Sequence, residues 1–379
     1  MIRRLILIFV ASLWILACVL TTAILIFRRP TPPEFEQATA AQPVELPCDE
    51  LGHFEAQTEW WYYTGFLTDE LGREYGFELV FFKSYVPDDM VMAGVLPLNW
   101  ISNPLYFSHF AVSDQAAGEH VFFEQINFPR FWRAGARADR YDVWNGDWRA
   151  WGDVSQSDGG WDCYGGDTQH LRASGGRYRL RLELEPARPP ALHGEAGVVE
   201  MGEAGYSYYY SRPDLEGLGL LYVDGERRVV QADAWMDHQW GSWDVHGGYG
   251  GWDWFSLRLD DGSRVMLFGF RDGAGQTMAG SGGTWIAPDG TTAELAAGDF
   301  SLEILDRWTS PETGGTYPVA WHLLIPAQGL DVSVAATFPE QEMAVDFGPV
   351  YWEGTVAVEG TARGNGFVEL TGYAEGSGH

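Results

Sequence analysis

The sequence predicts an all-β protein of two tandem domains behind an N-terminal transmembrane helix. Three observations support this fold class: apolar and polar residues alternate with period 2 in many short segments, turn signals recur between them, and 15% of the residues are aromatic. Period-2 alternation is typical of strands that bury one face, and aromatic residues favour sheets and apolar cavities over helical bundles. The chain has 379 residues, 46% of them hydrophobic, which is enough for two cores.

Residues 1–29 predict a membrane anchor. Arg3 and Arg4 precede an uncharged apolar run, Leu5 to Phe27, that is long enough to cross a bilayer as a helix. A cleavable signal peptide has a shorter apolar core, of about 7–15 residues. Processing as a lipoprotein at Cys18 is the alternative, although the apolar run continues well past that residue. We therefore expect a single-pass inner-membrane protein whose globular part lies in the periplasm.

The segment after the anchor, residues 30–47, is rich in Pro, Ala, Glu and Gln and is expected to be a linker. We place the first β domain at residues 48–228 and the second at residues 229–379. The clearest strand is Arg177 to Leu184, in which apolar and charged side chains alternate strictly. Asp-Gly pairs predict tight turns between strands, among them Asp224-Gly225 near the domain boundary.

A weak internal repeat supports the division into two domains. Trp60 to Gly65 leads through a turn into the strand Tyr75 to Phe82, and Trp252 to Ser256 leads through a turn into Val265 to Phe270. Each half resembles a β-hairpin that opens with a tryptophan-rich strand. A duplicated β unit would explain the match, and chance similarity in a chain with 18 tryptophans is the alternative.

Charge and cysteine content limit the partners. The net charge of −29 disfavours nucleic acid as a partner, and it also disfavours an acidic ligand. Lys83 is the only lysine in the chain. Besides Cys18, the cysteines are Cys48 and Cys163. Outside the cytoplasm these two could form a disulfide, and two free thiols are the alternative.

The densest polar cluster lies in the segment from Ala234 to Trp243. Asp237 and His238 are neighbours there, and Trp240 follows two residues later. In a strand, Asp237 would face one side of the sheet, and His238 and Trp240 the other. A histidine in an aromatic wall can transfer protons near neutral pH. The alternative is a buried His-Asp pair that braces a bend.

A second cluster contains Asp253 between Trp252 and Trp254, with Tyr249 close by in a glycine-rich stretch. If Asp253 points inward, desolvation raises the pKa of its carboxyl group and makes it a usable proton donor. The alternative is an outward aspartate that hydrogen-bonds a turn. We take the three aromatic residues as candidate ligand-binding residues.

A third cluster, in the first domain, contains Glu59, Trp61 and Tyr63, which share one face of a predicted strand. Glu59 is either a second acid or the solvated end of a strand. Tyr209 lies in a tyrosine-rich stretch that could line a pocket or pack in a core. The sequence lacks metal-ligand spacings, a P-loop, a dinucleotide fingerprint and a G-x-S-x-G elbow, so we expect neither a metal nor a cofactor.

The chain resembles the family of carotenoid 1,2-hydratases (hydroxyneurosporene synthases) and AttH proteins, often described as predicted secreted hydrolases. The resemblance covers about residues 46–374 and rests on these stretches in order: Thr58 to Gly65, Phe107 to Phe110, Ser207 to Ser211, Trp235 to Trp240, Gly251 to Phe255, Tyr351 to Gly354 and Glu369 to Tyr373. It implies two tandem lipocalin-like β-barrel or sandwich domains. It also implies a long apolar ligand in a pocket between or within them.

Hydratases of this family add water to the terminal double bond of acyclic carotenoids, so the resemblance implies an isoprenoid, carotenoid or lipid ligand. Their His-x-Trp motif matches His238 and Trp240, and their downstream Asp matches Asp253. Tyr249 or Trp252 stands where these hydratases have an aromatic residue. Hydrolysis of a lipid-like substrate is the other activity that the resemblance implies.

The implied hydration needs an acid, a base and a stabilised cation. Asp253 or Asp237 would protonate the alkene, His238 would act as the base, and the indole rings of Trp240 and Trp252 would stabilise the cation. A carrier or sensor that binds a hydrophobic molecule without chemistry is the alternative function. A weaker alternative is a structural envelope protein in which these side chains only brace β bends.

Overall fold

A computed structural model describes residues 12–21, 35, 38, 42–85, 92–93, 96–97, 103–153, 168–201, 205–242, 249–278, 280–345, 348 and 350–374. Residues 12–21 form a helix, while the rest of the predicted anchor and most of the predicted linker lie outside the described residues. No described helix has the length and hydropathy that a bilayer crossing requires. Cys48 is disulfide-bonded and Cys18 is free, while Cys163 lies outside the described residues.

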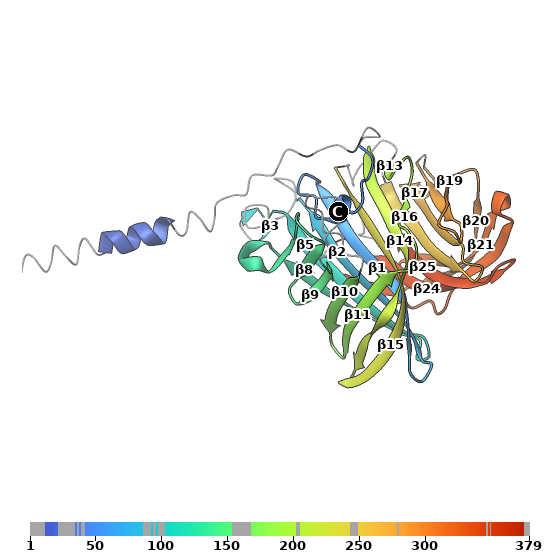
Figure 1. The fold of residues 1–379 in the computed structure, drawn as a ribbon, viewed down its shortest axis with the longest axis horizontal. Helices are drawn as coiled ribbons and strands as arrows, with labels where there is room; N and C mark the ends of the chain where they lie inside the picture. Colours follow the sequence, from blue (N-terminus) through green and yellow to red (C-terminus); the bar gives the residue numbers. More distant parts are fainter. Residues whose placement is uncertain are drawn as a thin grey trace, which may run out of the picture.

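The all-β prediction is confirmed, because two large antiparallel sheets make up the described globular part (Figure 1). The first sheet runs in the order β6-β5-β2-β1-β15-β14-β11-β10-β9-β8-β7, and β12 and β13 pair with β14. Its strands are β1 (Thr58–Asp69), β2 (Glu74–Ser84), β5 (Leu105–Asp114), β6 (Glu119–Asn127), β7 (Ala134–Ala136), β8 (Asp142–Asn145), β9 (Trp148–Gly152), β10 (Gln169–Gly175), β11 (Tyr178–Pro186), β12 (Ala191–Leu192), β13 (Val198–Glu200), β14 (Tyr206–Val223) and β15 (Glu226–Gly241).

The first sheet curls into a nearly closed barrel. Its two edges approach each other where β5 and β6 contact β8. The Asn145 side chain on β8 fastens this closure, because its amide donates hydrogen bonds to Ser108 Oγ on β5 at 3.0 Å and to the Gln125 carbonyl on β6 at 2.9 Å. Three short elements complete this half of the chain: the 3-10 helices η1 (Cys48–Glu50) and η2 (Arg130–Trp132), and a hairpin of β3 (Met92–Ala93) and β4 (Leu96–Pro97).

The second sheet forms a half-barrel beside the first (Figure 1). It runs in the order β19-β18-β17-β16-β25-β24-β22-β21-β20, with β23 paired to β24. Its strands are β16 (Tyr249–Leu259), β17 (Arg264–Asp272), β18 (Gly282–Ile286), β19 (Thr292–Ala296), β20 (Ser301–Thr309), β21 (Thr316–Ile325), β22 (Leu330–Ala336), β23 (Glu342–Met343), β24 (Tyr351–Gly360) and β25 (Gly364–Thr371), and η4 (Pro326–Gln328) joins β21 to β22. The two halves of the predicted repeat form the hairpins β1–β2 and β16–β17.

The described residues form four buried apolar clusters. One fills the barrel, one lines the concave side of the half-barrel, and the other two lie between the sheets and join them. β1 contributes to two of them, because its side chains alternate: Trp61 and Tyr63 point into the barrel, and Tyr62 packs against the second sheet. Both faces of β1 are therefore buried, which explains its nearly continuous aromatic sequence.

The domain boundary expected between residues 228 and 229 falls inside β15. Asp224 and Gly225 have φ values of +53° and +81°. A two-residue hairpin turn whose twist matches that of its strands has positive φ at both residues. That turn joins β14 to β15, and β15 then pairs along its length with both β14 and β1. The strand that carries His238 is thus part of the first sheet, and the chain passes to the second sheet between Gly241 and Tyr249.

Candidate functional site

The predicted site residues lie in three separate places. His238, Trp240, Glu59 and Trp61 point into the barrel, as their shared strand faces predict. Asp237, Tyr209 and Trp254 lie between the two sheets, together with Trp252 at the edge of that cluster. Asp253 lies on the concave side of the half-barrel, and the side chain of Tyr249 is outside the described residues.

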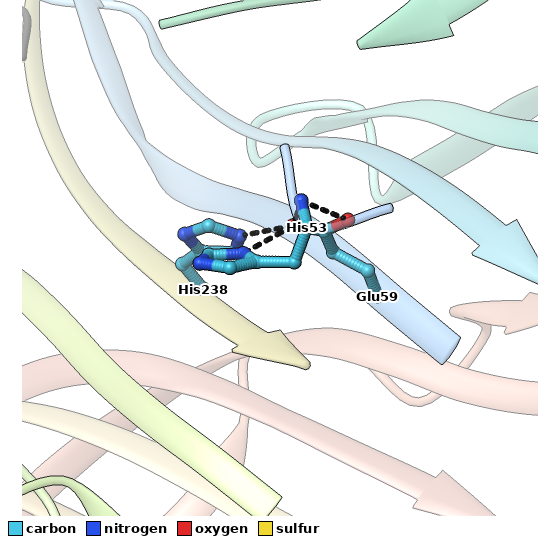
Figure 2. A group of neighbouring side chains, drawn as sticks. All are labelled: His53, Glu59 and His238. Atoms are coloured by element: carbon cyan, nitrogen blue, oxygen red, sulfur yellow. Dashed lines mark hydrogen bonds and ion pairs between the residues drawn. The ribbon is translucent and has the colours of Figure 1, made fainter. Parts of the chain in front are cut away.

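The barrel group centres on the carboxylate of Glu59 (Figure 2). His238 Nε2 lies 3.0 Å from Glu59 Oε1, and His53 Nδ1 lies 2.9 Å from the same oxygen. The second oxygen of Glu59 accepts a hydrogen bond of 2.7 Å from Lys83 Nζ. Glu59 and His238 are fully buried, and the His53 side chain is 20% exposed at the edge of the group.

The electrostatics of the barrel group follow from this arrangement. Burial opposes ionisation of Glu59, but the Lys83 ammonium and the hydrogen bonds from the two histidines hold the pKa of that carboxyl well below its usual range. Burial lowers the pKa of His238 to about 4, against the hydrogen bond to Glu59. Burial also opposes the charged form of His53, but Asp49 and Glu59 raise its pKa. His238 is therefore neutral at pH 7 and Glu59 is ionised.

Aromatic rings enclose the barrel group. The ring of His53 stacks on Trp240 with centroids 4.0 Å apart and planes 3° from parallel. Trp61 stacks on His238 at 5.1 Å. Tyr210 Oη lies 3.3 Å from His238 Nδ1, so both ring nitrogens of that histidine have partners.

His53, Glu59 and His238 are close enough to be considered as metal ligands, because one ligand atom of each lies within 4.8 Å of the others. Lys83 argues against this use. Its ammonium already neutralises the Glu59 carboxylate, and a divalent cation on the same carboxylate would meet that positive charge at close range. The group fits a charge-balanced hydrogen-bond network better than a metal centre.

Asp253 is engaged in a different network. Arg271 Nε donates a hydrogen bond to it at 3.1 Å, and Tyr373 Oη shares its one proton between the two carboxylate oxygens, at 3.0 and 3.1 Å. Burial raises the pKa of Asp253, and Arg271 and Tyr373 oppose that rise. The sequence resemblance places Asp253 and His238 in one site. In the structure the Asp253 carboxyl group and His238 lie in different places.

Asp237 has a buried place between the sheets. Trp235 Nε1 donates to it at 2.7 Å and Tyr209 Oη at 2.9 Å, and Ser211 Oγ makes a further hydrogen bond. Trp254 of the second sheet donates in turn to Tyr209 Oη at 3.0 Å, so the network crosses between the sheets. Burial raises the pKa of Asp237 to about 7, which these hydrogen bonds oppose.

Three further carboxyl groups meet beside Asp237. Glu353 on β24 and Glu369 on β25 are direct cross-strand partners, and Glu78 of β2 approaches them from the first sheet. We call Glu78, Glu353 and Glu369 the interface glutamates. Tyr62 donates a hydrogen bond to Glu353 across the interface, and Tyr351 donates one of 3.1 Å to Glu78 in the opposite direction.

The interface glutamates hold their protons at unusually high pH. Burial, reinforced by the charges of neighbouring carboxylates, raises the pKa of Glu78 to about 8 and that of Glu353 well above its ordinary value. Burial also raises the pKa of Glu369 to about 7, against a hydrogen bond from Trp252. No cationic side chain forms an ion pair with them in the part of the chain that the structure describes. Glu78 and Glu353 are therefore mainly neutral acids near pH 7, whereas Glu369 is about half ionised there.

Two oxygens of this cluster remain available. Glu78 Oε2 and Glu353 Oε1 are buried and have no hydrogen-bond partner among the described residues. An unpaired buried oxygen is costly unless something binds there. A neutral carboxyl group with a free oxygen among aromatic rings can donate a proton to an apolar substrate.

Comparison with known proteins agrees with the sequence resemblance. The AttH-like family matches residues 37–373, which is most of the chain. The chain belongs to the AttH-like family. A crystal structure of an AttH protein from Nitrosomonas europaea is similar, with 28% identity, a TM-score of 0.78, and coverage of 90% of this chain and 100% of that chain.

Two more distant structures share the fold of this AttH-like protein. Kievitone hydratase from Nectria haematococca has 16% identity and a TM-score of 0.66, with 90% of this chain and 97% of that chain covered. CghA, solved with Sch210972, has 12% identity and a TM-score of 0.50, with 91% of this chain and 98% of that chain covered. At these identities the likeness concerns the fold alone. No curated protein sequence matches the chain.

Sequence reasoning missed the interface glutamates and His53. A signal for the glutamates was present, since each has only apolar residues or glycine as its chain neighbours: Phe-Glu-Leu at Glu78, Trp-Glu-Gly at Glu353 and Val-Glu-Leu at Glu369. A lone carboxyl group at an inward strand position predicts a buried acid. His53 gave no local signal, because it precedes β1 in a loop and meets Glu59 only through tertiary packing.

Proposed function

We propose that this AttH-like protein is a hydratase that adds water to a carbon–carbon double bond of an apolar isoprenoid or lipid. The observation that carries the proposal is the pair of buried acids Glu78 and Glu353, each with a raised pKa and one carboxyl oxygen without a hydrogen-bond partner among the described residues. Hydration of an alkene begins with protonation of carbon, which needs an acid that still carries its proton near neutral pH. Aromatic rings around the acid would stabilise the cation that follows.

In the proposed reaction the acid gives one proton to the alkene and recovers one from water. The alkene π electrons form a carbon–hydrogen bond with the carboxyl proton of Glu353 or Glu78, which leaves a carboxylate and a tertiary carbocation. A water oxygen then bonds to the cation, and the carboxylate takes the extra proton of that water. The product is a tertiary alcohol, and the acid is restored. Tyr62, which donates a hydrogen bond to Glu353, packs edge-on against Trp254 with ring centroids 5.7 Å apart.

The barrel group has a positioning role in this proposal. His238 and Asp237 are neighbours on β15 but face opposite sides of it, and this supports assigning the acid step to the interface carboxyl groups. The hydrogen bond between His238 and Glu59 ties β15 to β1, the two strands that carry Asp237 and Tyr62. In this view His238 fixes the strand that carries Asp237 and does not touch the substrate.

The substrate class follows from the apolar surroundings and the family. We propose acyclic isoprenoids, carotenoids among them, which a bilayer would supply directly. Residues 1–29 would then anchor the protein in the inner membrane with its globular part in the periplasm. An anchored protein stays in the membrane pellet after alkaline carbonate extraction, and protease added to spheroplasts removes its globular part. Release by carbonate would contradict the anchor but leave the hydratase proposal intact.

Turnover in isotopically labelled water tests the activity. The purified full chain is incubated with lycopene in H₂¹⁸O, and the product is analysed by mass spectrometry. We expect a tertiary alcohol with one ¹⁸O atom. Glu353→Gln and Glu78→Gln should each lower kcat by about 10²–10⁴-fold, while Glu303→Gln, at an exposed glutamate of β20, should leave it unchanged. Wild-type rates in both interface variants would overturn the assignment.

The same experiment separates the hydratase from a carrier. A carrier would retain lycopene unmodified and in stoichiometric amount, and the bound ligand would raise its melting temperature. Retention without labelled product for lycopene and for shorter acyclic isoprenoids would favour the carrier.

A further inference from the structure

The outer face of the barrel carries three arginines in direct register. Arg149 on β9 lies opposite Arg172 on β10, and Arg172 lies opposite Arg181 on β11. We call these three residues the arginine row. Like charges directly opposite each other on neighbouring strands are destabilising. An anion that bridges the guanidinium groups would remove that repulsion.

The described chain neutralises only part of this charge. Asp142 accepts hydrogen bonds of 2.7 and 2.9 Å from Arg149. Arg172 donates to the backbone carbonyl of Asp147 at 2.9 Å, and neither Arg172 nor Arg181 forms an ion pair with a carboxylate among the described residues. Both side chains are exposed. The row is therefore a local positive patch on a chain whose net charge is −29.

Two hollows adjoin the row, and Arg172 lines both of them. The larger, of about 590 Å³, also has Arg181, Trp151 and Leu218 in its wall. The smaller, of about 350 Å³, is lined by further arginines and aromatic rings: Arg137, Arg140, Arg149, Trp132 and Trp144. Each wall also contains one carboxylate, Glu183 in the larger hollow and Asp142 in the smaller, but arginines outnumber these acids. Cationic and apolar groups thus share one face, which suits a ligand that is both anionic and apolar.

Two large apolar side chains project beside the smaller hollow. Phe131 and Trp132 are each 81% exposed, and their φ values are +57° and +60°. The left-handed region is uncommon for bulky residues and costs conformational energy. Trp144 Nε1 donates a hydrogen bond of 3.0 Å to the Trp132 carbonyl and fixes this arrangement. Folding gains nothing from two exposed aromatic rings in a strained turn, so a partner is the simplest reason for them.

We propose that this face of the barrel docks onto an anionic lipid bilayer. The arginine row would bind headgroup phosphates, which guanidinium groups match with paired hydrogen bonds. Phe131 and Trp132 would enter the interfacial layer, where aromatic side chains settle. A soluble anion would use the arginines but would leave the aromatic pair unused, which favours the lipid surface. The proposal is independent of the hydratase proposal.

Hydrogen exchange of the full chain in lipid nanodiscs tests the docking. Discs of phosphatidylglycerol are compared with discs of phosphatidylcholine, so that only headgroup charge differs. We expect slower exchange in phosphatidylglycerol at Phe131–Arg133 and along β9 to β11, and loss of this difference at high salt. Inorganic phosphate added to the phosphatidylcholine discs should not reproduce the protection. Equal exchange in both lipids, or full protection by phosphate alone, would overturn the proposal.

Charge-matched variants assign the effect to the row. Arg172→Gln with Arg181→Gln removes the two arginines that lack a carboxylate partner, and Arg307→Gln with Arg363→Gln removes two exposed arginines of the second sheet. Each arginine near an anionic surface strengthens binding by roughly fivefold. The first pair should therefore weaken the protection by about 25-fold, and the second pair should retain it. Equal loss in both pairs would show that only net charge matters and would contradict a defined docking face.

Discussion

Glu353 and Glu369 lie directly opposite each other on β24 and β25, where Glu353 is buried and Glu369 is half-buried. Two carboxylates in this position would repel strongly in a medium with little water. The pair can be accommodated only if protons remain on it. The same feature that makes the interface glutamates usable acids therefore makes the fold sensitive to pH.

The first prediction concerns stability in Glu369→Gln. The pKa of Glu369 is about 7 in the folded protein and 4.5 ordinarily. Below pH 4.5 both states hold the proton; above it the unfolded chain loses the proton first, so the wild-type free energy of unfolding falls until about pH 7. The free energy of unfolding of the variant does not fall in this way. At pH 8 it should exceed that of the wild type by on the order of 3 kcal/mol, and at pH 4 the two should differ little.

Urea unfolding followed by tryptophan fluorescence over that pH range measures the effect. Glu303→Gln is the matched control, because the side chain is exposed on β20 and should show no pH-dependent difference from the wild type. A Glu369→Gln variant that is less stable than the wild type at pH 8 would mean that the carboxylate form is stabilised, contrary to the pKa shift.

The second prediction concerns the pH profile of hydration. Loss of the proton from Glu78, with a pKa of about 8, should end activity as pH rises. Tyr351 lowers the pKa of Glu78 through its hydrogen bond, whereas Glu369 raises it through its charge. Tyr351→Phe should therefore move the alkaline limb to higher pH, and Glu369→Gln should move it to lower pH. Shifts in the same direction would exclude Glu78 as the titrating group.

Much of the fold could be predicted from the sequence, because strand alternation is a local property. The period-2 pattern of Arg177 to Leu184 reappears as β11 with strictly alternating burial. It also correctly assigned Asp237 and His238 to opposite faces of β15. The boundary expected between residues 228 and 229 lies inside β15, because a hairpin turn such as Asp224-Gly225 and a domain junction use the same residues and only strand pairing distinguishes them.

The sites were less predictable because they depend on contacts between distant strands. Glu59 pairs with Lys83, 24 residues away, and with His238, 179 residues away. The interface glutamates come together only when the second sheet packs on the first. Sequence spacing carries no information on that packing. In the sequence, Asp253 stands between two tryptophans and was therefore a more visible candidate acid than the interface glutamates.

The third prediction concerns the buried ion pair of the barrel group. Lys83→Met should leave the Glu59 carboxylate buried without its cation and lower the free energy of unfolding by about 3–5 kcal/mol. Glu59→Gln combined with Lys83→Met should recover part of that loss, because no uncompensated charge remains. Urea unfolding of the two single variants and the double variant measures the coupling energy. Additive losses would mean that Glu59 and Lys83 do not interact as a pair.

The fourth prediction concerns the contact between the two sheets. Asp214 of β14 is buried, and it binds Arg258 of β16 at 3.1 Å and Arg264 of β17 at 2.8 Å. Asp214→Asn would leave these guanidinium groups clustered without their anion. We expect the free energy of unfolding to fall by about 3–5 kcal/mol and the second sheet to unfold before the barrel, since the anion that joins their strands is gone.

Asp233→Asn is the control for this contact, because Asp233 also pairs with Arg258, at 3.3 Å, but is 59% exposed. Its loss should cost less than about 1 kcal/mol. Hydrogen exchange during urea unfolding shows whether β16 and β17 open before β1 and β15. The effect of Asp214→Asn should persist at high salt, because buried pairs are screened little. Equal, salt-sensitive losses in the two variants would show that the sheets are held together by apolar packing alone.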